Sequence, residues 1–68
     1  MKTTFRIHDG SDKTLYTLIK IRECLDRDTG YIGHDPDGLF LECDDADAAT
    51  VRALINDGGI DIADVKHY

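Results

Sequence analysis

The chain has 68 residues, of which 41% are hydrophobic and 32% charged, and its formal net charge is −6 at pH 7. This length and composition are typical of one small globular domain (residues 1–68) and exclude a disordered chain. The acidic balance argues against direct nucleic-acid binding, which needs a basic patch, and no apolar run approaches the roughly 20 residues of a membrane span.

The first predicted element is a strand at residues 3–8. Apolar and polar side chains alternate there, and the residue types favour β-structure, so Phe5 and Ile7 are expected to face inward. The dipeptide Asp9-Gly10 then breaks the strand.

A helix from about residue 12 to 26 follows, with Ser11 as its N-cap. Its apolar residues recur at helical spacing, namely Leu15, Leu18, Ile21 and Leu25. The competing interpretation makes residues 14–21 a second strand after an Asp-Gly hairpin, because Thr, Tyr and Ile favour strands. The apolar stripe favours the helix.

The middle of the chain predicts a hairpin. A short strand begins at Tyr31 and Ile32, and the residues Asp35-Pro36-Asp37-Gly38 match the chemistry of a turn. Residues 39–43 form the clearest strand, which is short and bounded on both sides.

The last part of the chain predicts a second helix and a closing strand. The helix runs over residues 46–56, is capped by Asp44 or Asp45, and ends at a left-handed Gly58. Its buried side is expected to carry Ala49, Leu54, Val51 and Ile55. The strand runs over residues 60–65.

The resulting order, βαββαβ, predicts an α+β ferredoxin-like domain with a four-stranded antiparallel sheet and both helices on one face. In this order of elements, almost the whole chain resembles heavy-metal-associated domains and small ACT-type regulatory domains. The metal-binding version of the fold carries a Cys-x-x-Cys pair after the first strand, where this chain reads His8-Asp9-Gly10-Ser11-Asp12. No metal or other cofactor is therefore expected.

The two cysteines, Cys24 and Cys43, lack the paired spacing of a zinc site and do not make a disulfide framework. We expect both to be small core residues in a reducing, cytoplasmic setting, since the N-terminus shows no signal-peptide pattern. The segment from Asp26 to Asp37 resembles an EF-hand loop, but Gly30 falls at position 5 instead of 6, and position 12 is Asp37 instead of a bidentate Glu.

No catalytic motif surrounds the histidines, and the chain is short for a pocket that holds several groups, so no enzyme is expected.

The most distinctive feature of the sequence is an acidic segment. Residues 23–47 hold nine acidic residues against Arg27 alone. Such a field attracts basic protein surfaces, although carboxylates in turns and caps also serve local structure and solubility. The predicted partner-binding residues are Asp26, Asp28, Asp35, Asp37, Asp44, Asp45 and Asp47.

Two functions follow as hypotheses. The first is an acidic protein-interaction module that occupies the nucleic-acid groove of a larger basic protein, in the manner of small phage and mobile-element inhibitors such as anti-CRISPR proteins. The second is a regulatory domain that senses a ligand or metal and acts as a homodimer through its sheet. Its candidate ligand-binding residues are His8, Asp9 and Asp12.

Overall fold

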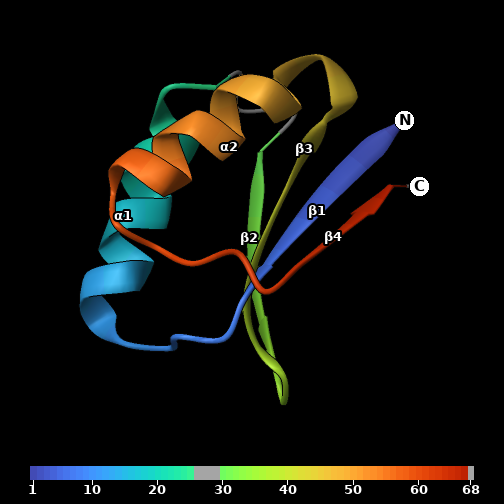
Figure 1. Ribbon diagram of the computed structural model, residues 1–68. Coiled ribbons are helices and arrows are strands. Elements are labelled where there is room, and N and C mark those ends of the chain that lie inside the picture. The colour runs from blue at the N-terminus through green and yellow to red at the C-terminus, as the bar shows by residue number, and fades with distance from the viewer. Residues whose placement is uncertain (26–29, 68) are drawn as a thin grey trace.

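The computed structural model describes residues 1–25 and 30–67 (Figure 1). Its elements, in chain order, are β1 (Lys2–Ile7), α1 (Asp12–Glu23), β2 (Tyr31–Asp35), β3 (Gly38–Asp44), the one-turn 3-10 helix η1 (Asp45–Asp47), α2 (Ala48–Asp57) and β4 (Asp64–His67). Among these, no helix is long and apolar enough to cross a membrane.

The four strands form one antiparallel sheet in the order β2-β3-β1-β4, and both helices pack against the same face (Figure 1). This is the predicted ferredoxin-like arrangement. Residues 14–21 are helical, so the hairpin interpretation of this segment is wrong. The segment is helical because its apolar stripe packs against the face of the sheet that the helices cover.

The core lies between the sheet and the helices. Its buried apolar residues are Phe5, Ile7, Leu18, Ile21, Leu39, Leu41, Cys43, Val51, Ile55 and Ile60. In β3 every second side chain is buried, which is the two-residue period of a strand with one covered face. Fully burying a side chain of this kind contributes about 1.5–3 kcal/mol.

The first helix begins as predicted and ends earlier. The Ser11 hydroxyl accepts the Thr14 N–H at 3.4 Å. The helix ends at Glu23 rather than near residue 26, because the Cys24 N–H turns back to the Ile21 carbonyl in a tighter final turn.

The second helix begins at Ala48, two residues later than predicted, because η1 occupies the first turn. Neither Asp44 nor Asp45 caps α2. Asp44 stands before η1 without a side-chain capping bond, and Asp47 is the residue before α2. Val51 and Ile55 face the sheet as expected.

Ala49, predicted to be buried, is exposed, and Ala48 packs against the core instead. The reason is helical phase. Ala49 lies two residues before Val51, so its side chain points about 200° away around the helix.

The end of the chain also differs from prediction. The left-handed glycine is Gly59, with φ 74°, while Gly58 keeps a right-handed conformation. The last strand spans Asp64–His67 rather than residues 60–65. The Ile60 N–H still bonds back to Ile55 and its side chain is buried, so the chain has to cross the end of α2 before it can pair with β1.

The two cysteines differ in environment. Cys43 is buried, whereas Cys24 is exposed, with its thiol directed to the Lys20 carbonyl at 3.4 Å. The prediction that both are core residues is therefore wrong for Cys24, because the apolar stripe of α1 runs along another side of the helix. Burial raises the pKa of the Cys43 thiol to about 11, and the nearby carboxylates of Asp47, Asp44 and Asp45 contribute further.

We predict that iodoacetamide alkylates Cys24 and spares Cys43 in the native protein at pH 8. Only the thiolate attacks the reagent, and Cys43 is both buried and held in the thiol form. Mass spectrometry of intact and digested protein measures the modification at each site. In urea both cysteines should react, and equal native rates would contradict the assigned burial.

Candidate functional site

One face of the sheet carries no helix, and we call it the helix-free face. Because the residues of β3 that face the helices are buried, the alternate residues point the other way, and their register partners on neighbouring strands share that face. It comprises Tyr31, Gly33, Asp35, Phe40, Glu42, Asp44, Lys2, Thr4, Arg6, Asp64 and Lys66.

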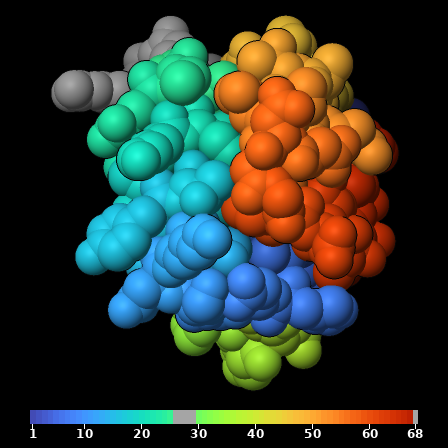
Figure 2. All heavy atoms as spheres, turned by 60° about the vertical axis from the view of Figure 1, so that its left-hand side comes forward, coloured from blue at the N-terminus to red at the C-terminus, as the bar shows by residue number. Residues whose placement is uncertain are grey.

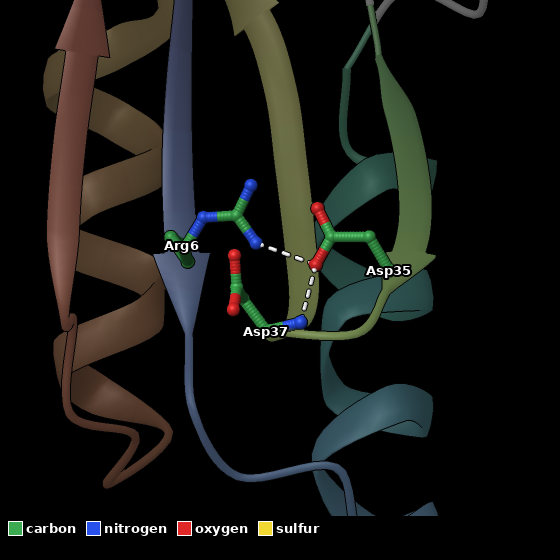
Figure 3. Close-up of polar contacts among 3 residues, drawn as sticks. All are labelled: Arg6, Asp35 and Asp37. Carbon is green, nitrogen blue, oxygen red and sulfur yellow. Dashed lines mark hydrogen bonds and ion pairs between the residues drawn. The ribbon is translucent and has the colours of Figure 1, made fainter.

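An ion pair spans β3 at the hairpin end of this face. Nη1 of Arg6 on β1 lies 2.7 Å from Oδ1 of Asp35 at the end of β2, and the bond between them crosses β3 (Figure 3). The same carboxylate oxygen accepts the backbone N–H of Asp37 at 3.0 Å, which ties the pair to the β2–β3 turn. The hydrogen bond from Arg6 holds the pKa of Asp35 below its ordinary value.

Arg6 also lies against an aromatic ring. Its Cζ atom is 5.5 Å from the centroid of the Phe40 ring, which is within cation–π range. Phe40 in turn lies across Gly33 of the neighbouring strand. A Cβ atom at position 33 would approach the ring to 2.2 Å, so only glycine lets the ring lie in this place.

The face carries a second aromatic residue. Tyr31 is 58% exposed, and its ring centroid lies 6.0 Å from that of Phe40 at an interplanar angle of 47°. Among the aromatic residues that the structure describes, only Phe5 belongs to the buried core, so Tyr31 and Phe40 remain on the helix-free face.

The acidic residues predicted to bind a partner do not form one patch. Asp26 and Asp28 lie outside the described residues. The other five fall at opposite ends of β3, with Asp35 and Asp37 at its start and the remaining three at and beyond its end. A seven-residue strand separates its ends by about 20 Å. We call the second group, Asp44, Asp45 and Asp47, the acidic end.

The acidic end is anchored to the first strand. Lys2 Nζ lies 3.1 Å from Asp44, and this hydrogen bond raises the pKa of the lysine. Asp45 accepts a hydrogen bond from the Thr3 hydroxyl, which also lies 3.1 Å from Nδ1 of His67. Asp44 at the end of β3 and Asp45 and Asp47 in η1 thus follow one another at one end of the sheet.

A separate cavity of about 420 Å³ lies beside the loop between β1 and α1 and the segment between α2 and β4. Its lining residues are His8, Asp9, Lys13, Thr14, Thr17, Gly58, Gly59, Ile60, Asp61 and Ala63. Figure 2 views this side, where the blue first loop borders the orange-red segment after α2.

Two of the three residues predicted to bind a ligand line this cavity. His8 and Asp9 do so, whereas Asp12 does not. Asp9 is held in place by the Thr14 hydroxyl at 2.6 Å and the Ser11 N–H at 2.9 Å. These hydrogen bonds, chiefly that of Thr14, lower the pKa of Asp9 and keep it ionised.

In the part of the chain that the structure describes, no group of three or more His, Cys, Asp or Glu side chains is placed to hold a metal ion. The chain matches no family model, no curated protein and no solved structure in comparisons with known proteins. Its function therefore has to be inferred from the chemistry of these surfaces.

We predict that the coupling free energy between Arg6 and Asp35 depends on pH. Because the folded pKa of Asp35 lies below its ordinary value of 3.8, ionised Asp35 favours the folded state. This contribution is complete above pH 3.8 and disappears as pH falls through the lower, folded pKa. A double-mutant cycle with Arg6→Met and Asp35→Asn, followed by urea unfolding from pH 7 to pH 2, measures it.

The coupling should be constant between pH 5 and pH 7 and approach zero at the acid limit. The cycle controls for the other contacts of Arg6, because these are lost equally in both backgrounds. A coupling that is unchanged at the lowest pH would show that the ion pair does not contribute.

Proposed function

We propose that the protein is a non-enzymatic binding module whose acidic end engages a basic surface of another protein. The observation that carries this proposal is the gathering of Asp44, Asp45 and Asp47 at one end of the sheet. After burial, which is the main cause, their charges also contribute to the raised pKa of the buried Cys43 thiol, so all three lie close to the end of β3. A complementary basic surface would relieve their mutual repulsion.

The finer proposal is that this surface substitutes for nucleic-acid phosphates. Carboxylates on a rigid strand end and the adjacent helical turn present a row of fixed negative charges, as a phosphate backbone does. A protein that carries them would compete with nucleic acid for a basic groove. It would thereby inhibit the cytoplasmic protein that contains this groove. Small inhibitors from phages and mobile elements, including anti-CRISPR proteins, are a class that acts in this way.

The test uses capture from nuclease-treated lysate of the source cells, with elution over a salt series. We expect a basic protein to be retained, released by moderate salt and displaced by added DNA or RNA, because interactions between exposed charges are screened. The variant Asp44→Asn/Asp45→Asn/Asp47→Asn should bind this protein roughly tenfold more weakly, since each exposed ion pair contributes about 0.2–1 kcal/mol.

The matched control is Asp12→Asn/Asp57→Asn/Asp61→Asn, which changes the net charge by the same amount with exposed residues outside the acidic end. Its affinity should stay close to that of the unmodified protein. If both triple variants lose affinity equally, net charge alone matters, and the acidic end is not the binding surface.

A second candidate function is favoured by the cavity beside His8 and Asp9. Its volume of about 420 Å³ suits a small metabolite. Its charged lining residues include both signs, namely Asp9, Asp61 and Lys13. A regulatory domain would use such a site to sense a polar ligand, with a homodimer formed through the sheet.

We predict that, if this second function holds, a panel of metabolites and metal salts contains a compound that raises the melting temperature. At about 100 times its Kd, such a compound adds about 2.7 kcal/mol to the free energy of unfolding. Lys13→Ala and Asp61→Asn should abolish the shift. Asp12→Asn should leave it unchanged, because Asp12 does not line the cavity. No shift across the panel would count against a sensing role.

A further inference from the structure

The helix-free face contains an arginine-binding arrangement that the protein fills with its own side chain. The guanidinium of Arg6 lies over the Phe40 ring, with 5.5 Å between Cζ and the ring centroid, and bonds to the Asp35 carboxylate at 2.7 Å. An aromatic ring supplies a surface for stacking, and a carboxylate beside it accepts the N–H groups. These two groups, side by side on neighbouring strands, hold an arginine.

The same two kinds of group occur together a second time on this face. Tyr31 on β2 and Glu42 on β3 are direct partners in the antiparallel register, so their Cβ atoms lie about 4.5–5.5 Å apart. Tyr31 is 58% exposed and its ring stands beside that of Phe40. Both groups are therefore accessible from solvent at the same place.

No cation of the described residues bonds to Glu42. Lys2 is close enough for the Glu42 charge to raise its pKa, but its ammonium group forms its ion pair with Asp44. The Glu42 carboxylate is not buried, and it forms no hydrogen bond or ion pair among residues 1–25 and 30–67. Tyr31 and Glu42 thus offer an exposed ring and, among the described residues, a carboxylate without a hydrogen bond or ion pair.

We propose that Tyr31 and Glu42 form a docking site for an arginine side chain of a partner protein. The inference rests on the proposed function, because it assumes a basic partner, and it assigns that partner a specific chemistry. A guanidinium satisfies both groups at once, since its plane stacks on the ring while its edge donates to the carboxylate. A lysine ammonium is more strongly hydrated and gives a single point of contact.

The surrounding charge favours a cationic protein over other occupants. Asp44 follows Glu42 on the same face and continues into the acidic end, so an arginine-rich segment can bind both regions together. The phosphates of a nucleic acid lying over Tyr31 would instead meet the Glu42 carboxylate, while the nearby Lys2 is already paired with Asp44. An arginine at Tyr31 would also fix the register of the partner, which the acidic end alone does not.

The test measures binding of oligoarginine and oligolysine peptides of equal length by isothermal titration calorimetry at low ionic strength. We expect oligoarginine to bind more tightly. Tyr31→Leu and Glu42→Gln should each weaken oligoarginine binding about threefold to fivefold, the loss of one exposed cation–π contact or ion pair. Oligolysine binding should change less, so the preference for arginine should shrink.

The matched controls are Tyr16→Leu and Asp57→Asn, which remove an exposed tyrosine and an exposed acid from the helices. Both should keep full affinity and full preference for arginine. Tyr31→Phe keeps the ring and should also bind normally, which separates loss of the ring from loss of the fold. Circular dichroism on each variant verifies the native structure.

The outcomes separate this inference from the proposed function. Equal binding of the two peptides, weakened only by Asp44→Asn/Asp45→Asn/Asp47→Asn, would overturn the arginine site and leave the acidic module standing. Absence of binding by either peptide would overturn both. If sedimentation shows a dimer that Tyr31→Leu and Glu42→Gln abolish, the face is occupied by a second copy and the arginine site is wrong.

Discussion

The position of β1 at the centre of the sheet is the constraint on which the rest of the structure depends. Phe5 pairs with Leu41 on one side and with Val65 on the other, and all three point toward the helices. Because side chains alternate along a strand, a shift of one residue in this register would turn the whole buried set toward solvent. The register that buries the core therefore also decides which residues form the helix-free face.

The polar chemistry of that face follows from the same register. Arg6, one residue after Phe5, must point away from the core, and β3 is the strand beside it. Its guanidinium then meets Phe40 and Asp35, while Gly33 gives the Phe40 ring room to lie across the sheet. This part of the face thus combines an ion pair, a cation–π contact and an aromatic pair, all made by side chains of strand residues.

The distribution of acidic residues follows from strand geometry rather than from sequence distance. A segment that is continuous in the sequence is divided by β3, so the carboxylates at its two ends act in different places. At the hairpin, Asp35 forms an ion pair with Arg6, whereas the carboxylates of the acidic end lie at and beside η1. The proposed arginine site at Tyr31 and Glu42 lies toward the same end of β3 as the acidic end, so in the proposed function one basic partner would contact both regions.

The sequence by itself determined the order of elements, the turn at Pro36-Asp37 and most of the core, because residue periodicity and turn chemistry are local properties. It also indicated that His8 and Asp9 lie at the same site, because the two residues are adjacent in the chain. It did not reveal that Cys24 is exposed, that Ala49 points outward, or that β4 starts at Asp64, since the side of each helix that is covered and the path of the chain around α2 depend on packing. Only the tertiary structure brought Tyr31 beside Glu42 and Arg6 beside Asp35, because those contacts join residues on different strands, and their register is fixed by burial of the whole core.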